Sequence, residues 1–227
     1  MPLWRVDYTL ARFDRKEVVC GGRAHVYRVW EGDASYGIKM YPTSTHLSTC
    51  LHEVALLRRL KHPHVVEVLS IFEDPDTRSF CIQMPWYEGG QLDQWLDSSR
   101  PSRDTVLAVL VQVLYAIEHL HAFGVVHADI KPANILVGAN NRAFLGDFDV
   151  SVDSSTRTSV AHLRATTMTS IAFTQGFDAP ELLHTGASQA SDMFAFGATA
   201  LFALGAVGEP ISGTEAVLEE EEEEEEE

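Results

Sequence analysis

The spacing of hydrophobic residues differs between the two halves of the chain. In the first half, short runs rich in β-branched and aromatic residues are bounded by turn residues, which predicts strands. The expected strands cover residues 16–19, 24–30, 36–41, 65–72 and 80–86. The segment 48–60 instead repeats its apolar residues at helical spacing. Its expected buried face consists of Leu51, Val54, Leu57 and Leu60. This half is therefore predicted to be a sheet accompanied by one main helix.

Helical patterns dominate after Gly89-Gly90. The expected helices cover residues 92–96, 102–121, 180–183 and 188–204. In the longest of these helices, 102–121, Ser102 is a suitable N-cap and Gly124 follows the C-terminal end. Its expected buried face consists of Val106, Val109, Leu110, Val113, Leu114 and Ile117. Residues 135–137 and 143–145 fit a small hairpin, and 151–170 lack periodicity and are expected to form a loop.

These patterns predict an α+β protein with two lobes. We expect an N-terminal extension over 1–12, a strand-rich lobe over 13–86, a mostly helical lobe over 87–208 and an acidic tail over 209–227. A cleft between two lobes is a common place for a small-molecule site.

Charge and cysteine content narrow the functional classes. Nine of the net sixteen negative charges come from the unbroken run Glu219–Glu227, which is expected to be a solvated, disordered tail. The remaining sequence has no basic stripe, so nucleic-acid binding is not expected. Three cysteines without a signal peptide suggest reduced thiols in a cytoplasmic or nuclear protein. The longest uncharged run, residues 193–208, is shorter than the roughly 20 residues of a membrane span, so none is expected.

One segment carries the most specific chemistry. Asp129, Lys131 and Asn134 follow His127 within eight residues, and Asp147 comes thirteen residues after Asn134. Phosphoryl transfer from a metal-bound nucleotide needs a carboxylate to orient the attacking hydroxyl, a cation near the moving phosphate and oxygen ligands for Mg²⁺. This spacing supplies all three.

The segment resembles the eukaryotic protein kinase signature, His-Arg-Asp-x-Lys-x-x-Asn followed by Asp-Phe-Gly. Two positions depart from it, because Ala128 stands for the arginine and Asp149 for the glycine. The resemblance implies that Asp129 is the catalytic aspartate, that Lys131 balances the γ-phosphate, and that Asn134 and Asp147 hold Mg²⁺. A lysine at the position of Lys131 is typical of serine/threonine kinases.

The resemblance extends upstream to a nucleotide site. Lys39 on the third strand and Glu53 on the following helix match the lysine–glutamate ion pair of the family. The glycine-rich loop is matched only in part, by Gly21, with Val19 in place of another glycine. The remaining positions implied to contact ATP are Val26, Gly37, Met84, Tyr87 and Leu136.

Downstream, Thr174 matches a catalytic-site threonine with which serine/threonine kinases contact the catalytic aspartate and lysine. Residues 179–181 match the Ala-Pro-Glu segment of the family, and Asp192 matches a buried aspartate that anchors the catalytic loop. Kinases continue through further helices after this point, so the sequence resembles a kinase domain truncated in its C-terminal lobe. Phe194, Phe196, Leu201 and Phe202 are then expected to be partly bared. Gln91 and Ala133 replace acids that recognise basic peptides, so a preference for arginine is not expected.

The resemblance implies a serine/threonine protein kinase that uses ATP and Mg²⁺ and phosphorylates a protein hydroxyl. A second interpretation is a pseudokinase, a nucleotide-binding or scaffolding module without phosphoryl transfer. It rests on Ala128, Asp149, Val19 and the missing helices. A small-molecule kinase of similar fold is a third interpretation, which Thr174 and the Ala-Pro-Glu segment disfavour. The sequence leaves the oligomeric state open.

Overall fold

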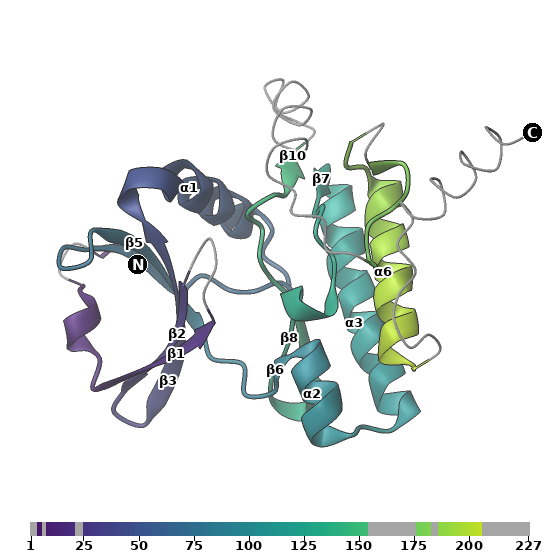
Figure 1. Ribbon diagram of the computed structural model, residues 1–227, viewed down its shortest axis with the longest axis horizontal. Coiled ribbons are helices and arrows are strands. Elements are labelled where there is room, and N and C mark those ends of the chain that lie inside the picture. The colour runs from purple at the N-terminus through teal and green to yellow at the C-terminus, as the bar shows by residue number, and fades with distance from the viewer. Residues whose placement is uncertain (1–3, 6–7, 21–24, 154–175, 183–185, 206–227) are drawn as a thin grey trace, which may run out of the picture. The chain divides into compact units, whose positions relative to one another are not determined.

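A computed structural model of the chain describes residues 4–5, 8–20, 25–153, 176–182 and 186–205. Its contacts divide the chain into two compact units, Met1–Glu88 and Gly89–Glu227 (Figure 1). The division lies two residues beyond the boundary between the lobes expected from the sequence. The first unit consists of a sheet and a helix and the second is mainly helical, which is the predicted α+β architecture.

The first unit is built on one antiparallel sheet with the strand order β1-β2-β3-β5-β4. Its elements are η1 (Leu10–Arg12), β1 (Arg15–Cys20), β2 (His25–Glu31), β3 (Ala34–Pro42), α1 (Thr43–Arg59), β4 (Ser70–Asp74) and β5 (Ser79–Pro85). Successive side chains of a strand point to opposite faces, so β3 serves two clusters. Ile38 and Met40 belong to one cluster, with η1, and Tyr41 belongs to the other, with Cys50 and Val54 of α1.

Two expectations for this unit were wrong in detail. The predicted strand over 65–72 begins only at Ser70, because a turn closes between His62 and Val65 and pairing with β5 starts near Leu69. Val65 and Val66 are buried outside strand β4, because an apolar run indicates burial rather than membership of a strand. Leu51 is half exposed, whereas Cys50, Glu53, Val54 and Leu57 are buried, because the face of α1 against β3 and β5 includes the polar Glu53.

The second unit surrounds the long helix α3. Its elements are β6 (Gly90–Gln91), α2 (Leu92–Ser99), α3 (Arg103–Ala122), β7 (Val125–Val126), η2 (Pro132–Asn134), β8 (Ile135–Val137), η3 (Ala139–Asn141), β9 (Ala143–Leu145), β10 (Val152–Asp153) and α6 (Gln189–Ala203). Ser102 caps α3 by accepting a hydrogen bond from the Thr105 amide at 3.2 Å. The face predicted to be buried is confirmed, with Leu114 only partly covered.

Helix α3 is long and apolar enough to cross a membrane, by length and composition alone. This is weak evidence for a span, because the central helix of a globular domain has the same composition. Here α3 contacts β9, β7 and α6, and seven of its residues are buried. Its packing is that of a core helix.

Short strands and tight turns join these helices. The predicted hairpin is present as β8 and β9, and β6 pairs with β8. The Gly89 amide donates to the Val137 carbonyl at 2.8 Å, and a Cβ on Gly89 would lie 2.7 Å from that oxygen, so only glycine fits. The loop expected over 151–170 instead starts with strand β10, which pairs with β7. The rest of that loop and part of the helix expected over 180–183 lie outside the described residues.

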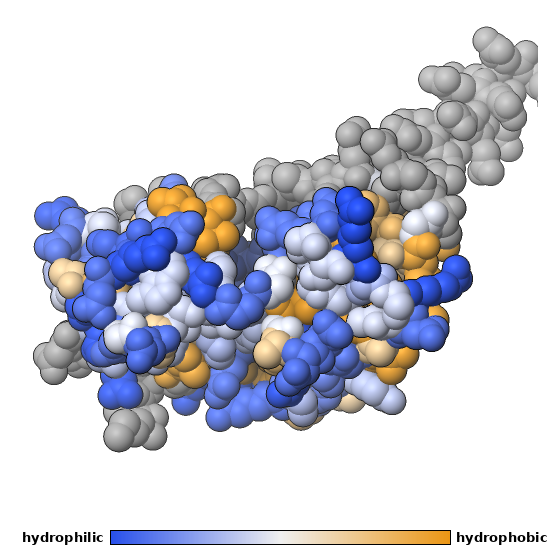
Figure 2. All heavy atoms as spheres, turned by 90° about the horizontal axis from the view of Figure 1, so that it is seen from below, coloured by the Kyte–Doolittle hydropathy of each residue, from blue (hydrophilic) through white to orange (hydrophobic). Residues whose placement is uncertain are grey.

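Exposed apolar residues are found on both α3 and α6. Phe194 and Leu201 are exposed and Phe202 is partly covered, as expected, whereas Phe196 is buried and that expectation was wrong. On α3, Leu107, Val111 and Tyr115 recur every four residues and are exposed. The face seen in Figure 2 is mainly hydrophilic, and polar side chains separate its hydrophobic patches.

Candidate active site

The candidate site residues in the first unit gather on one face of the sheet. Val26 pairs with Lys39, and Gly37 pairs with Met84, so these four residues lie on the same face. Gly37 is buried, and a Cβ there would lie 3.0 Å from Met84 Cγ. This face therefore combines close-packed apolar atoms with one ammonium group.

Lys39 is held by a buried ion pair. Its Nζ lies 3.0 Å from Glu53 Oε1, and only 9% of the Lys39 side chain and 3% of the Glu53 side chain are exposed. Tyr41, two residues along β3, donates its hydroxyl to Glu53 Oε2. The strand carries Lys39 and Tyr41 on one face, and α1 brings Glu53 to them. The carboxylate thereby fixes a long, flexible side chain in one position.

Other predicted nucleotide contacts in this unit are placed differently. Val19 lies at an irregularity of β1 and is exposed. Tyr87 is buried, and its hydroxyl accepts a hydrogen bond from the Glu67 amide at 3.4 Å. Gly21 lies outside the described residues, as does Thr174 in the second unit.

In the second unit, the candidate catalytic loop joins β7 to β8. Lys131 Nζ lies 2.9 Å from Asp129 Oδ1, and Asn134 Nδ2 donates to Asp129 Oδ2 at 2.8 Å and to its backbone carbonyl at 2.7 Å. Each oxygen of the Asp129 carboxylate is thus held by one neighbour. The three residues that the motif singles out lie together, and the Asp129 side chain remains about one-quarter exposed.

The loop backbone is anchored by Asp192 of α6, as the resemblance predicted. Its Oδ2 accepts a hydrogen bond from the His127 amide, and its Oδ1 accepts one from the Ala128 amide, each at 2.8 Å. His121 Nε2 also lies 2.8 Å from Oδ2. Ala128 has a φ of +65°, a left-handed conformation that alanine adopts at a cost of about 1–2 kcal/mol. Two charge-assisted hydrogen bonds at the same place offset that cost.

His127 links this loop to the segment around Asp147. Its Nε2 lies 3.0 Å from the Gly146 carbonyl, and its Nδ1 accepts from the Asp129 amide at 3.3 Å. Its ring meets Phe148 edge to face at 4.8 Å between centroids. Ser151 donates to the His127 carbonyl at 2.9 Å. Sequence reasoning gave no role to His127, Ser151 or His121. Membership of the motif was a sequence signal for a role of His127, whereas no such signal marked Ser151 or His121.

The hairpin places Asn134 next to the segment that holds Asp147. The Gly146 amide donates to the Asn134 carbonyl at 2.9 Å, directly beyond the pair Ile135–Leu145. Leu136 lies between Ile135 and Val137, which are buried, and points to the opposite face of β8, where it is partly exposed. Asp147 adopts a φ of +62°, and its carboxylate and that of Asp149 approach within 4.8 Å.

The donors at this place suit a hard divalent cation. The amide nitrogen of Asn134 is turned toward Asp129, so its amide oxygen points the other way, and Asp147 and Asp149 add carboxylate oxygens. Oxygen ligands of this kind are the ones Mg²⁺ takes in proteins. The residues present therefore fit the ion that the resemblance implies.

Comparison with known proteins identifies the class. Residues 15–226 match the family model described as a protein kinase domain, so the chain belongs to the protein kinase domain family.

Three relatives show how far the similarity reaches. The chain is 31% identical to the serine/threonine-protein kinase GRIK1 of Arabidopsis thaliana over 57% of its length and 36% of the relative's. It is 32% identical to the serine/threonine-protein kinase ssp1 of Schizosaccharomyces pombe over 67% of its length and 24% of the relative's. It is 30% identical to the serine/threonine-protein kinase TIO of Arabidopsis thaliana over 71% of its length and 12% of the relative's. The chain thus spans little more than a third, or less, of these curated relatives, and the similarity supports a kinase function.

Proposed function

We propose that the chain is a serine/threonine protein kinase that transfers the γ-phosphoryl group of ATP to a hydroxyl group of a protein, with Mg²⁺ as cofactor. The observation that carries this proposal is the arrangement around Asp129, whose two carboxylate oxygens are held by Lys131 and Asn134 at 2.9 and 2.8 Å. The printed names of the relatives support the serine/threonine class.

In this proposal, Asp129 accepts a hydrogen bond from the substrate hydroxyl and orients its oxygen for attack. A carboxylate that orients a nucleophile must keep one geometry, and its contacts with Lys131 and Asn134 restrict its rotation. Asp192 supports the same geometry because its carboxylate accepts hydrogen bonds from the backbone amides of residues 127 and 128. Lys131, one-fifth exposed, is the cation that balances the charge of the moving phosphoryl group.

The first unit binds the nucleotide in this proposal. The face that carries Val26, Gly37 and Met84 receives the adenine, with Tyr87 and Leu136 as further contacts. Lys39 binds phosphate oxygens, and Glu53 keeps its ammonium in place. Because that pair is buried, its charge is little screened by solvent.

Asn134 and Asp147 would hold the Mg²⁺. A bound Mg²⁺ supplies charge neutralisation along the triphosphate during transfer. Asp149 adds a second carboxylate within 4.8 Å of Asp147, where the family signature has glycine. This extra negative charge favours the alternative of a nucleotide-binding or scaffolding module that transfers no phosphate, as does Ala128 in place of arginine.

The test combines nucleotide binding with phosphoryl transfer. Wild-type protein, Asp129→Asn and the control Asp104→Asn, an exposed acid on α3, are incubated with radiolabelled ATP, Mg²⁺ and a peptide library containing serine and threonine. We expect transfer by the wild type and the control, and a loss of at least about a hundredfold in Asp129→Asn. Thermal shifts with ATP and Mg²⁺ run in parallel.

The outcomes separate the two candidates. A thermal shift without transfer in wild-type protein would favour the scaffolding module. Transfer that persists in Asp129→Asn would contradict the assignment of Asp129. Replacing Asp149 by glycine then shows whether the added carboxylate limits the rate.

A further inference from the structure

The sheet face that carries the candidate nucleotide residues continues along β2 beyond Val26. Val26 pairs with Lys39, and Arg28, two residues further along the strand, pairs with Gly37. Alternate residues of a strand share a face, so Arg28 lies on the same face as Val26, one step further from Lys39. Arg28 is thus next to the residues that the proposed function assigns to the adenine, without being one of them.

The Arg28 guanidinium lies between two tryptophans. Its Cζ is 4.9 Å from the ring centroid of Trp30, on the same strand, and 4.8 Å from that of Trp86, directly after β5. Strand β3 separates β2 from β5, and its residue opposite Arg28 is Gly37, which has no side chain. The long arginine side chain therefore reaches from β2 to the segment that follows β5.

Two hydrogen-bonding partners complete this group. Arg28 Nη2 lies 2.8 and 3.0 Å from the two carboxylate oxygens of Glu88, and 3.3 Å from Ser35 Oγ. The Arg28 side chain is 26% exposed and that of Glu88 is 60% exposed. An ion pair this exposed contributes little, whereas a cation gains attraction from each indole face that it covers. Of the two links to the segment after β5, the stacking on Trp86 is therefore expected to be the stronger.

Tyr87 lies between the two residues that Arg28 contacts in this segment, and a different part of the chain holds its side chain. Tyr87 is buried, and its hydroxyl accepts a hydrogen bond from the Glu67 amide at 3.4 Å. Residues 86, 87 and 88 are thus all fixed through their side chains. In the proposed function, the contact of Tyr87 with adenine is then made by its backbone.

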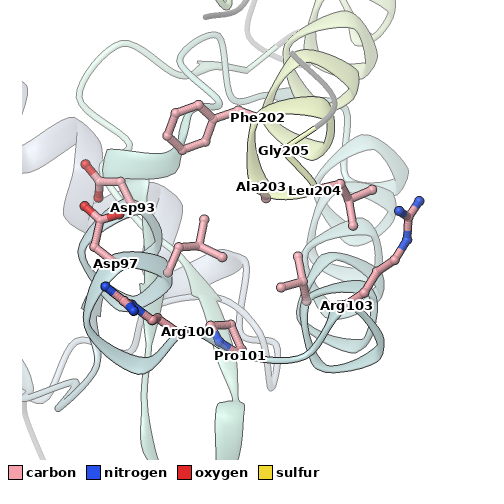
Figure 3. A pocket seen from close by; sticks show the side chains of 11 residues that line it. Asp93, Asp97, Arg100, Pro101, Arg103, Phe202, Ala203, Leu204 and Gly205 are labelled. Atoms are coloured by element: carbon pink, nitrogen blue, oxygen red, sulfur yellow. The ribbon is translucent and has the colours of Figure 1, made fainter. Parts of the chain in front are cut away.

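This fixation is not shared by every arginine of the chain. Arg100 and Arg103 line a pocket of about 510 Å³ between α2, α3 and the end of α6 (Figure 3). Neither forms an ion pair or a cation–π contact with another residue of the described ranges. Fixing a long side chain costs conformational entropy, so the four partners of Arg28 mark it as a structurally constrained residue.

We propose that Arg28 is a positioning residue for the nucleotide, an inference that rests on the proposed function. By stacking on Trp86 and pairing with Glu88, Arg28 holds residues 86–88 close to β2 and keeps the Tyr87 backbone in the position that binds adenine. A preorganised segment binds more tightly, because it loses less freedom when the ligand arrives. Arg28 touches none of the candidate catalytic residues in the described ranges, so it acts on ATP binding and leaves the transfer step unchanged.

The first experiment measures ATP binding to the full chain by calorimetry in the presence of Mg²⁺. Arg28→Leu should raise the Kd of ATP about tenfold. Arg28→Lys keeps the charge but lacks the planar group that stacks on both rings, and should raise the Kd about threefold. In the transfer assay, Arg28→Leu should raise the KM for ATP with kcat unchanged.

The matched control is Arg15→Leu. Arg15 also lies over Trp30, with its Cζ 4.5 Å from the ring centroid, but its ion pair is with Glu17 on its own strand. This variant removes a similar cation from the same tryptophan without altering the contacts with Trp86 and Glu88. It should change the Kd of ATP by less than about twofold.

A double variant tests whether Arg28 acts through Trp86. Residues that act through one contact are not additive. Arg28→Leu/Trp86→Leu should therefore bind ATP no more than about twofold more weakly than Arg28→Leu alone. Glu88→Gln, which removes only the exposed ion pair, should raise the Kd by about twofold.

Hydrogen exchange of the nucleotide-free protein tests the positioning itself. The amides of residues 86–88 should exchange at least about threefold faster in Arg28→Leu than in wild type, because local opening becomes easier. Arg15→Leu should leave their exchange unchanged. This measurement needs no nucleotide and therefore does not depend on the proposed function.

The outcomes separate the two proposals. Equal ATP affinity in Arg28→Leu and Arg15→Leu would overturn the role of Arg28, as would a fall in kcat with the KM for ATP unchanged. Unchanged exchange of residues 86–88 in Arg28→Leu would show that Arg28 does not hold the segment. Wild-type protein that binds no ATP would contradict the proposed function, and faster exchange in Arg28→Leu would then still support its hold on residues 86–88.

Discussion

The two units each hold a lysine–carboxylate pair at almost the same distance, in different surroundings. Lys39 and Glu53 are 3.0 Å apart with side chains 9% and 3% exposed, and Lys131 and Asp129 are 2.9 Å apart with side chains 20% and 24% exposed. A buried pair loses its hydration and is destabilising once one partner is removed, whereas an exposed pair contributes little to stability. Almost equal distances therefore occur in very different surroundings. The first pair is buried in the core of its unit, and the second remains partly accessible to solvent.

The largest effect is expected at Asp192, the buried carboxylate that anchors the loop of the second pair. Asp192→Ala removes the acceptor of the His127 and Ala128 amides and the contact with His121. We expect the free energy of unfolding to fall by about 3–4 kcal/mol, because one buried and one partly buried amide lose a charged acceptor. Urea unfolding measures it, with Glu118→Ala on the exposed face of α3 as the control. A loss below about 1 kcal/mol would mean that the loop is held by other contacts.

The next effect concerns the buried pair itself. Glu53→Leu removes the buried carboxylate that accepts from the Lys39 ammonium and the Tyr41 hydroxyl, and should lower the free energy of unfolding by about 3 kcal/mol. The triple variant Lys39→Met/Tyr41→Phe/Glu53→Leu replaces all three polar side chains together. It should recover most of that loss, since apolar replacements of a buried pair are often neutral or better. Failure to recover would show that the pair contributes to stability directly.

A third effect depends on pH and involves Asp74, a buried acid at the end of β4. Burial by itself raises the pKa of Asp74, but hydrogen bonds from the Thr77 side chain and from the Leu10 and Thr77 amides outweigh it and hold the pKa below its usual value. A depressed pKa contributes stability above the unfolded value of about 4, and this is lost as pH falls through the folded value.

Asp74→Asn should therefore be less stable than wild type near pH 7, and the difference should shrink below about pH 4. Urea unfolding at pH 7, 5 and 3 measures this. A difference that stays constant across the three pH values would show that the carboxylate charge is unimportant.

The smallest effect on stability is expected at the partly exposed pair, Lys131 and Asp129. Asp129→Asn keeps the shape of the side chain and should change the free energy of unfolding by less than about 1 kcal/mol. Phosphoryl transfer should nevertheless be lost. Asp129→Asn is thus expected to lose activity with little loss of stability, whereas Glu53→Leu is expected to lose both. A loss of stability in Asp129→Asn as large as that in Glu53→Leu would contradict the comparison.

Much of the fold follows from local patterns that can be read directly. The strands β2, β3 and β5, the hairpin of β8 and β9 and the helix α3 with its Ser102 cap all lie where periodicity and turn residues place them. The predicted strand over 65–72 and the assignment of Leu51 to the core failed. In both cases the pattern indicated only apolar character. The start of the strand depended on pairing with β5, and the buried face of α1 includes Glu53 because of the elements packed against it.

The chemistry near Asp129 was predictable because its members lie within a few residues, where spacing constrains geometry. The contact between Lys39 and Glu53 was predictable as a pair on neighbouring elements. No pattern indicated that His121 and Ser151 support the loop, because their partners lie 71 and 24 residues away and the contact exists only after packing.

The amino-acid sequence by itself determined the class of this protein, since short-range spacing of charged and amide side chains is preserved in any fold that keeps the loop intact. Only the tertiary structure decided which carboxylate oxygens are hydrogen-bonded and which are not. Asp192 and Asp93 look alike along the chain, yet one accepts three hydrogen bonds and the other has an oxygen that is buried and unpaired among the described residues. Burial and hydrogen bonding are properties of packed elements, and no local pattern carries them.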